Sequence, residues 1–394
     1  MNFIFISPAF PQNYYNFCDR LKINKVNVLG IGDTPYNELR PEVIKSLTEY
    51  YKVSSLENYD EVYKAVAYFA FKYGKIDWLE SNNEYWLRQD SLLRTDFNIQ
   101  GPKFKDVECF TSKSKMKDFY KNAGVPTARY KFCTTIEEDL EFIKKVEFPV
   151  VVKPDVGVGA AKTYRISNEA DLIKFYDDGF DVPYIIEEYI EGNIISLDGV
   201  CDSNSNIVFC DNQIFPPSIM DIVNECLEVS FYVNKQVPED VKDKGQKVLK
   251  AFNIKSRFFH LEFFRLTKAK EGIGEVGDVV ALEVNMRPPG GFAPNLINYS
   301  QSVDCYQIWA DVIAYNKSYV KMDYEKYYAI YVARRKHLNY VYSKDEIAQM
   351  YKNNITVVDR NPEVLAVAMG DDFFMAKFTT LEEAKAFEEI VLKK

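Results

Sequence analysis

The chain has 394 residues, of which 47% are hydrophobic and 15% aromatic, with 28 Tyr and 28 Phe. This composition excludes disorder and low complexity as the main character, and the length suits about two or three compact units. The net charge of -9 argues against nucleic acid as a bulk partner, because binding to a phosphate backbone needs a basic face.

No apolar stretch reaches the roughly 18 residues of a membrane-spanning helix, and no basic leader accompanies the apolar run at 3–6. The seven cysteines are scattered without a Cys-x-x-Cys pair, which favours reduced thiols over a disulfide framework. We therefore expect a cytoplasmic protein with no membrane partner. The only histidines are His260 and His337, which argues strongly against a histidine metal cluster.

The first part of the chain predicts a parallel α/β domain, because strands and helices alternate along it. The patterns of apolar residues place these elements at 2–6, 13–21, 26–30, 57–72, 76–80 and 84–97. We expect this domain to close near residue 108.

Two segments of this domain raise the question of a ligand. Gly30 and Gly32 resemble the start of a dinucleotide fingerprint, but they follow the second strand and no third glycine follows at the required spacing, which favours a structural turn. Residues 80–83 follow a strand at the edge where open α/β sheets bind ligands. A helix N-cap formed by Ser81 or Asn82 explains this segment equally well.

A basic helix and a glycine-rich hairpin come next. Residues 113–121 predict a helix with four lysines, a pattern typical of a solvated face in which one lysine is enough to reach a phosphate. Residues 148–154 form a strand that ends in Lys153-Pro154, and a glycine-rich loop leads into a second strand at 163–166. A Walker A loop needs a following helix, so this order excludes one.

We interpret the hairpin loop as a flap over phosphates. The small residues Gly157 and Gly159 let backbone N–H groups approach phosphate oxygens, and Lys153 supplies a point charge from the strand. Glycines also occur in ordinary hairpins, so the two glycines alone do not decide the matter. The position of Lys153 directly before the loop favours the flap.

Residues 182–192 predict an apolar strand that carries two acids, Glu187 and Glu188. The backbone of a short extended hinge at this point could read the edge of a purine while Glu187 accepts from its exocyclic amine. A strand that emerges into solvent fits the same residues equally well, so both interpretations stay open.

The next elements lead to the strongest functional signal. Residues 194–200 and 207–214 predict a hairpin, residues 214–234 an irregular segment that lines an acceptor pocket, and residues 240–252 a helix. An aromatic and apolar stretch at 258–264 then predicts a strand that carries Glu262.

Glu283 and Asn285 lie two residues apart in a second apolar run, so both side chains point to one face of a strand. Arg287 follows where the prolines and glycines of 288–291 end that strand. We expect this strand to pair with the strand of Glu262 and to hold magnesium on a nucleotide.

The surroundings of Glu262 favour a metal. A carboxylate enclosed by Leu and Phe costs on the order of several kcal/mol when it has no partner, and a divalent cation offsets that cost. Oxygen ligands without a Cys/His cluster favour magnesium, which keeps several waters and relies on substrate phosphates. A half-buried strand with a polar face toward water is the alternative. His260 shares the face of Glu262 and fits a packed core histidine as well as a site residue.

The rest of the chain predicts a small α/β lobe without catalytic chemistry. A helix at 302–315 precedes three strands at 328–333, 363–368 and 373–378. A final helix begins at Thr380, where Glu383 completes a capping box.

The candidate residues occur in one fixed order: Lys113, Lys153 with its glycine loop, and the segments 187–190, 260–262 and 283–287. This order resembles the ATP-grasp superfamily. It is most similar to the carboxylate-amine ligases, including L-amino acid ligases, and more distantly to biotin carboxylase and the carbamoyl-phosphate synthase large subunit. The resemblance covers residues 113–312 well and the N-terminal part less specifically.

The resemblance implies a mixed α/β and α+β fold, namely the ATP-grasp fold with an N-terminal parallel α/β domain and a small C-terminal α/β lobe. The expected domains are residues 1–108, an ATP-grasp domain at 109–315 and the lobe at 316–394. Within the ATP-grasp domain, residues 109–185 would form the small subdomain with the flap and residues 186–315 the larger one with the metal site.

The resemblance also implies an ATP site. Lys113 and Lys153 would lie on the phosphates of ATP, below the loop of Gly157 and Gly159. The hinge would read adenine through the backbone of Glu188 and Ile190 and the side chain of Glu187. Relatives carry a ribose-binding glutamate where this chain has Ile194, and Asp198 is the candidate substitute.

The same resemblance implies the metal ligands and the reaction. Glu262, Glu283 and Asn285 would hold Mg²⁺, with Mn²⁺ as an alternative, and Arg287 would steady the transferring phosphoryl group and the acyl phosphate. A small-molecule carboxylate would take the γ-phosphoryl group of ATP, and an amine would displace phosphate to form an amide-type bond. The alternatives are an ATP-grasp kinase, in which phosphate stays on the substrate, and a nucleotide-binding regulatory protein without turnover. The assembly state is left open, with a homodimer as one option.

Overall fold

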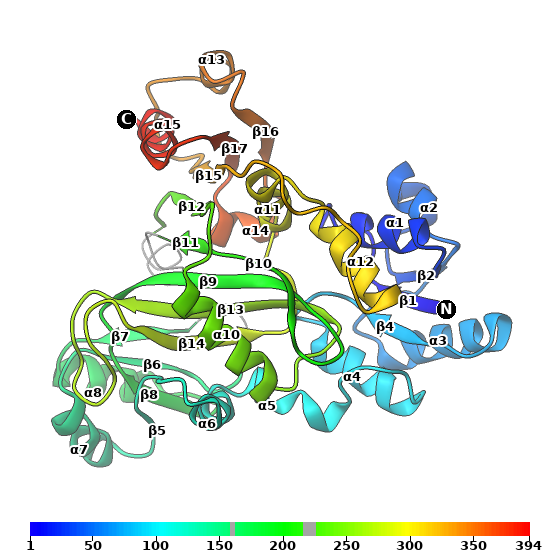
Figure 1. The fold of residues 1–394 in the computed structure, drawn as a ribbon. Helices are drawn as coiled ribbons and strands as arrows, with labels where there is room; N and C mark the ends of the chain where they lie inside the picture. Colours follow the sequence, from blue (N-terminus) through cyan, green and yellow to red (C-terminus); the bar gives the residue numbers. More distant parts are fainter. Residues whose placement is uncertain (158–161, 216–225) are drawn as a thin grey trace.

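The structure is a computed structural model that describes residues 1–157, 162–215 and 226–394. Three sheets organise these residues: a four-stranded parallel sheet, a four-stranded antiparallel sheet and a nine-stranded sheet. Figure 1 shows the small antiparallel sheet packed below the green strands of the large sheet, with the N-terminal sheet beside them. No helix in the described ranges is long and apolar enough to cross a membrane.

The N-terminal sheet is parallel, as the sequence predicts, and its strands have the order β3-β2-β1-β4. Its strands are β1 (Asn2–Ile6), β2 (Asn27–Gly32), β3 (Glu49–Lys52) and β4 (Trp78–Glu80). They alternate with α1 (Tyr15–Ile23), the short helix η1 (Tyr36–Glu38), α2 (Pro41–Ser46), α3 (Tyr59–Tyr73) and α4 (Leu87–Asp96). The continuous apolar run of β1 is typical of a strand that is covered on both faces.

The predicted turn at Gly30 and Gly32 is wrong, because both glycines lie inside β2. A Cβ at Gly30 would come within 2.6 Å of the Leu47 side chain, and one at Gly32 within 2.6 Å of the Tyr50 hydroxyl. These glycines therefore serve close packing inside a strand instead of a bend.

The small sheet has the order β5-β8-β6-β7 and is antiparallel throughout. Its strands are β5 (Tyr130–Phe132), β6 (Val150–Pro154), β7 (Tyr164–Ile166) and β8 (Tyr184–Glu188). The helices of this region are the short helix η2 (Phe104–Asp106), α5 (Glu108–Thr111), α6 (Lys113–Ala123), α7 (Ile136–Val146) and α8 (Glu169–Asp178). Apolar side chains of α7 and α8 pack on one face of this sheet, and the predicted β6-loop-β7 hairpin is confirmed.

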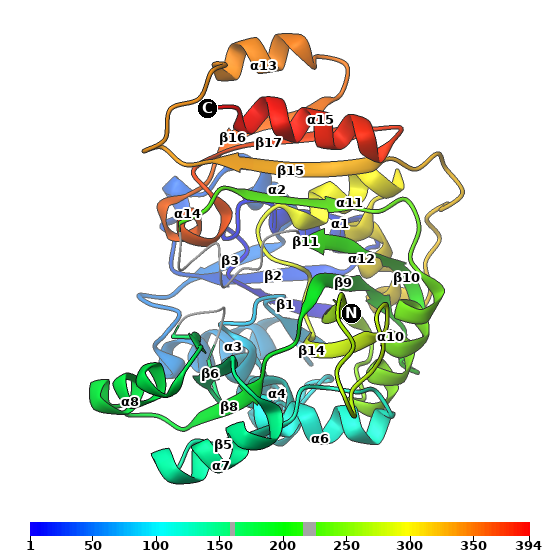
Figure 2. The same cartoon turned by 90° about the vertical axis from the view of Figure 1, so that its left-hand side faces the viewer.

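The large sheet has the order β14-β13-β9-β11-β12-β15-β17-β16, and β10 also pairs with β9. Its strands are β9 (Gly192–Cys201), β10 (Ile207–Asp211), β11 (Gln213–Phe215), β12 (Val229–Val233), β13 (Arg257–Leu266), β14 (Val279–Asn285), β15 (Tyr328–Arg334), β16 (Ile355–Arg360) and β17 (Asp372–Phe378). Its helices are α10 (Glu239–Ala251), α11 (Ala293–Gln301), α12 (Cys305–Tyr315), α13 (Lys344–Met350), α14 (Glu363–Met369) and α15 (Leu381–Leu392). Figure 2 shows the C-terminal strands β15 and β17 continuing this sheet beneath α15.

Residues 363–368 were predicted as a strand, but they form helix α14. A contact from outside the segment favours the helix: the guanidinium of Arg335 donates hydrogen bonds to the carbonyl oxygens of Ala366 and, at 3.0 Å, of Val367. A cation at the C-terminal end of a helix is stabilising, and a local pattern of apolar residues does not reveal it. The predicted capping box of Thr380 and Glu383 at α15 is confirmed.

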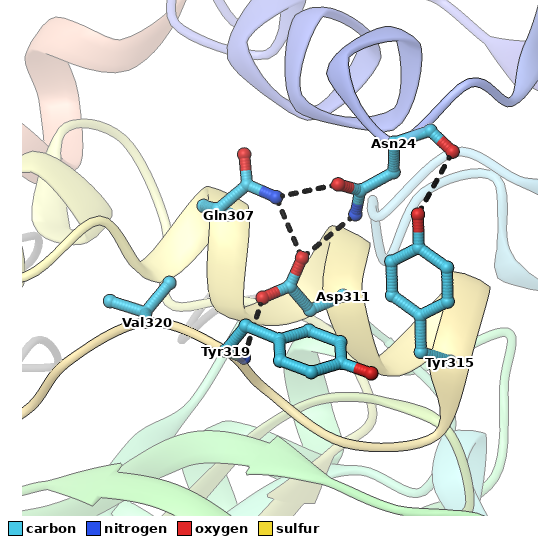
Figure 3. A pocket seen from close by; sticks show the side chains of 6 residues that line it. All are labelled: Asn24, Gln307, Asp311, Tyr315, Tyr319 and Val320. Atoms are coloured by element: carbon cyan, nitrogen blue, oxygen red, sulfur yellow. Dashed lines mark hydrogen bonds between the residues drawn. The ribbon is translucent and has the colours of Figure 1, made fainter.

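The main core joins the N-terminal sheet to the large sheet. Trp309 of α12 is fully buried, and its ring centroid lies 5.0 Å from that of Phe17 and 5.7 Å from that of Phe3. At the edge of this contact, Asp311 accepts hydrogen bonds from the Asn24 side chain at 2.9 Å and the Gln307 side chain at 2.7 Å (Figure 3). Helix α1 is thereby held against α12, and the carboxyl end of β4 lies beside the end of β14.

Candidate nucleotide and metal site

The metal candidates lie on neighbouring strands, as the sequence predicts. In the antiparallel pair of β13 and β14, Glu262 is opposite Glu283 and His260 is opposite Asn285. Because side chains alternate along a strand, these four side chains share one face of the sheet. The register shifts directly after Glu262, and such an irregularity is a common means of re-aiming side chains next to a site.

The two facing carboxylates have opposite pKa shifts. Burial and the charges of Glu262 and Glu84 raise the pKa of Glu283 to about 7. Burial also acts to raise the pKa of Glu262, but its hydrogen bond with His260 and the charges of His260 and Arg287 bring the net pKa below its ordinary value. A cation between the carboxylates would relieve the repulsion that Glu283 experiences.

The donor atoms at this position fit magnesium. Two carboxylates and the buried amide of Asn285 supply hard oxygen ligands, and no cysteine lies among them. In the described ranges, no three His, Cys, Asp or Glu side chains gather closely enough to hold a metal ion alone. Magnesium at nucleotide sites uses one or two carboxylates together with substrate phosphates, so this small set is sufficient.

A buried aspartate joins the two predicted phosphate lysines. Asp155 follows β6, and its carboxylate accepts from the Ser112 hydroxyl at 2.8 Å and from the Ser114 N–H at 2.7 Å. The backbone N–H of Lys113 donates to the Asp155 carbonyl oxygen at 2.9 Å. The start of α6, which bears Lys113, is thereby held at the end of β6, which bears Lys153.

Glu187 of β8 is held between Lys153 of β6 and Lys117 of α6. The Nζ of Lys153 lies 2.7 Å from Glu187 Oε2, and the Nζ of Lys117 lies 3.0 Å from Glu187 Oε1. Burial acts to raise the pKa of Glu187, but the charges of Lys117 and Lys153 lower it to about 2. Both carboxylate oxygens already have cationic partners, so accepting a hydrogen bond from a purine amine would compete with these ion pairs.

The sequence prediction missed Lys117 as a buried partner of Glu187. This lysine is 7% exposed and donates to the Ala128 carbonyl oxygen at 3.1 Å as well as pairing with Glu187. Its spacing from Lys113, four residues along α6, puts both lysines on one helix face, and this spacing was the available signal.

Lys113 faces the carboxylates of the large sheet. Its ammonium donates to the Gly157 carbonyl oxygen at 3.1 Å. Burial lowers the pKa of Lys113, the charge of Glu283 opposes this effect, and the charge of Lys153 adds to it. Lys113 and Lys153 therefore lie near the carboxylates of β13 and β14, and together with Arg287 these side chains form one charged cluster. Gly159 lies outside the described residues.

The predicted hinge follows the end of β8. The carboxylate of Glu188 is used internally, since it accepts from the Arg129 backbone N–H and side chain at distances between 2.7 and 3.0 Å. The backbone N–H of Glu188 donates to the Arg129 carbonyl oxygen at 3.0 Å. In the part of the chain that the structure describes, no hydrogen bond engages the backbone N–H of Ile190. An adenine contact at Ile190 remains a prediction that this arrangement permits.

Asp198 lies on β9 and is fully buried. Its carboxylate contacts His260 Nδ1 and the Ser196 hydroxyl, and accepts from Gln213 Nε2 at 2.7 Å. Both carboxylate oxygens therefore have partners within the chain. A ribose contact by Asp198 remains a prediction, and this arrangement adds no support to it.

Arg287 connects the end of β14 to the N-terminal sheet. Its Nη2 lies 2.6 Å from Glu84 Oε2, and its Nη1 donates to the Pro288 carbonyl oxygen at 3.0 Å. Asn83, Glu84 and Arg287 line a small cavity together with Phe110 and other residues of both regions. Glu84 was not predicted, because its partner lies 203 residues further along the chain.

The predicted N-cap at Ser81 or Asn82 is wrong. The hydroxyl of Ser81 donates to the Asp90 carboxylate at 2.6 Å, and α4 begins after Trp86 without a side-chain cap. Of the predicted segment 80–83, Glu80 is buried beside Arg94 and Arg257, while Asn83 reaches the cavity.

Comparisons with known proteins show sequence similarity to ATP-dependent ligases. Residues 111–217 match the family model of the phosphoribosylglycinamide synthetase ATP-grasp (A) domain. The chain is 23% identical over 266 residues to the L-arginine-specific L-amino acid ligase of Bacillus subtilis, covering 64% of this chain and 62% of that ligase. It is 33% identical over 123 residues to the phosphoribosylamine–glycine ligase of Clostridium acetobutylicum, covering 29% of this chain and 30% of that protein. Each match spans less than two thirds of the relative's length.

Solved structures resemble the chain over nearly its whole length. The L-amino acid ligase from Bacillus licheniformis superimposes with a TM-score of 0.73 at 15% identity, covering 98% of this chain and 96% of that one. The biotin carboxylase domain of the Hydrogenobacter thermophilus 2-oxoglutarate carboxylase, solved with MgADP, gives 0.67 at 16% identity, covering 97% and 87%. At such identities the likeness shows the fold, which is the ATP-grasp fold that the sequence predicts. Residues 111–217 thus match an ATP-grasp domain model, and the described structure has the fold of these ATP-grasp proteins.

Proposed function

We propose that the protein is an ATP- and magnesium-dependent ligase that activates a carboxylate as an acyl phosphate and joins it to an amine, releasing ADP and phosphate. The observation that carries this proposal is the charged cluster of lysines and carboxylates. Lys113 and Lys153 face the carboxylates Glu262 and Glu283, and Arg287 lies at the end of the same strand.

The chain's contribution is position and charge. The ammonium of Lys153 is anchored by Glu187 and that of Lys113 by the Gly157 carbonyl oxygen, so both are positioned for the phosphates. Preorganised charge of this kind dominates phosphoryl transfer, which requires no nucleophilic side chain. Arg287 would bind the oxygens of the transferring phosphoryl group and of the acyl phosphate.

The metal ligands would be Glu262, Glu283 and Asn285. A bound Mg²⁺, or Mn²⁺ in its place, supplies charge neutralisation for the phosphates. The adenine would contact the backbone at Ile190. The division into residues 1–108, 109–315 and 316–394 belongs to the same proposal, with the flap between β6 and β7 in the small subdomain.

Product analysis tests the reaction type. The protein would be incubated with MgATP, pools of small carboxylic acids and pools of amino acids as amines, and ADP and free phosphate would be measured separately. A ligase releases equal amounts of ADP and phosphate only when acid and amine are both present. ADP without free phosphate would indicate a kinase, and nucleotide binding without any turnover would indicate a regulatory protein.

A further inference from the structure

His260 lies between the metal candidate Glu262 and a buried aspartate. Its Nε2 lies 3.0 Å from Glu262 Oε1, and its Nδ1 contacts Asp198 Oδ1. The ring is 6% exposed, so protein surrounds it on nearly all sides. Burial lowers the pKa of His260, but the two carboxylates more than offset this effect and raise it to about 10. Both ring nitrogens are therefore engaged by carboxylates.

The contact continues across the sheet. Asp198 is opposite His260 on β9, and Ser196 is opposite Glu262. Gln213 on β11 donates through Nε2 to Asp198 at 2.7 Å and through its backbone N–H to the Ser196 hydroxyl at 3.3 Å. A row of hydrogen bonds thus runs from β11 through β9 and β13 to Glu262.

The side chains of this row form more hydrogen bonds with one another than the packing of a single buried histidine would need. Ser196, Asp198 and Gln213 are each fully buried, and each contacts another member of the row. Asp211, opposite Asp198 on β10, is also fully buried, and neither of its carboxylate oxygens has a hydrogen-bond partner in the described part of the chain. The hydrogen bonds of this buried face therefore converge on His260, and His260 directs its second nitrogen to Glu262.

We propose that His260 is a positioning residue for the metal site, which holds Glu262 Oε1 so that Oε2 stays available to the cation. The proposal rests on the proposed function, because it takes Glu262 as a metal ligand. A glutamate side chain alone has several rotamers, and ordering it on metal binding costs free energy. Partners that orient a ligating side chain typically change metal affinity by about 10-fold to 100-fold when they are removed.

Two substitutions at His260 separate its two contacts. In His260→Gln, the amide nitrogen lies near the place of Nε2 and can still donate to Glu262, while the contact with Asp198 is lost. In His260→Asn, the amide lies near the place of Nδ1 and can still donate to Asp198, while the contact with Glu262 is lost. The pair is matched in chemistry, and only one variant keeps the contact with the metal candidate.

The experiment measures Mn²⁺ affinity in the presence of ADP from the loss of the free Mn²⁺ paramagnetic resonance signal. We expect His260→Gln to stay within about threefold of the wild type and His260→Asn to bind Mn²⁺ about 10-fold to 100-fold more weakly. ADP affinity without metal should be the same in all three proteins, and Glu262→Gln serves as the reference for a lost ligand. A purely structural role would change both variants alike.

Several outcomes would overturn the proposal. Equal Mn²⁺ affinity in the wild type and a folded His260→Asn would remove the positioning role while leaving the metal site in place. If His260→Asn does not fold, a folded His260→Gln that loses Mn²⁺ as severely as Glu262→Gln overturns the proposal, and one that keeps its affinity supports it. A wild type that binds ADP but no Mn²⁺ would instead refute the proposed function, and this inference with it.

Discussion

Replacing Glu187 by Gln removes the carboxylate that Lys117 and Lys153 share inside the small sheet. The pKa of Glu187 falls from an ordinary 4.5 to about 2, which corresponds to roughly 3 kcal/mol of stabilisation at pH 7. The substitution also leaves two buried ammonium groups without their shared anion, and breaking a buried pair in this way typically costs about 3–5 kcal/mol. We therefore expect Glu187→Gln to lower the local stability of the small sheet by at least about 3 kcal/mol at pH 7.

The sign of the pH dependence follows from the lowered pKa. The contribution of Glu187 is fully present above its unfolded pKa of about 4.5 and is lost as the pH falls toward the folded value of about 2. The variant should therefore differ most from the wild type at neutral pH. The difference in local stability between the variant and the wild type should shrink as the pH falls from about 4.5 to about 2.

Hydrogen exchange followed by mass spectrometry on peptides from β6 and β8 provides a local assay. A loss of 3 kcal/mol in local stability lowers protection about 100-fold, since 1.4 kcal/mol is a factor of ten. Glu191→Gln is the matched control, because Glu191 also pairs with a lysine, Lys268 at 3.0 Å, but in an exposed position. An exposed pair contributes about 0–1 kcal/mol, so the control should be nearly silent. Equal protection in Glu187→Gln and Glu191→Gln would refute the assignment of Glu187 as a buried anchor.

Four further predictions concern the charged cluster. Glu283→Gln should abolish substrate-dependent ADP release while near-ultraviolet circular dichroism stays unchanged, and normal turnover would refute the metal assignment. Lys153→Ala should weaken ATP binding at least tenfold in a calorimetric titration, because it removes a charge-assisted phosphate contact, and no loss would count against that role. Since Glu283 has a raised pKa of about 7, a metal ion competes with its proton. The Mn²⁺ affinity with ADP should therefore rise with pH and level off above 7, and a flat profile between pH 6 and 8 would contradict this. In the metal-free protein, the raised pKa of Glu283 should lower stability as the pH rises from about 4.5 to about 7.

The predictable part of the site rests on local pattern. Alternation within one strand placed Glu283 and Asn285 on a common face, and the apolar surroundings of Glu262 marked it as a carboxylate that needs a partner. The strand, loop and strand around Lys153 distinguished this hairpin from a Walker A loop. Each of these signals spans fewer than about 20 residues, which is the range over which backbone periodicity and turn chemistry act.

The missed residues depend on contacts between distant segments. Lys117 looked like one of several solvated lysines until the small sheet placed Glu187 beside it. Glu84 became a site residue because α1 packs on α12 and brings β4 to the end of β14. His260 fitted a core residue and a site residue equally well, and only the register of β13 with β9 revealed its second carboxylate partner, Asp198.

The charges of the cluster give a reason for a divalent cation. Its cationic side chains are Lys113, Lys117, Lys153 and Arg287, and its carboxylates are Glu84, Glu187, Glu262 and Glu283. His260, whose pKa is raised to about 10, adds a cation that contacts both Glu262 and Asp198. Lys117 and Lys153 already form ion pairs with Glu187, and Arg287 forms one with Glu84, so the cluster offers little unpaired positive charge to a nucleotide that carries several negative charges. A cation between Glu262 and Glu283 would convert the most negative part of the cluster into a phosphate-binding surface, and for this reason we expect ATP to bind as its metal complex.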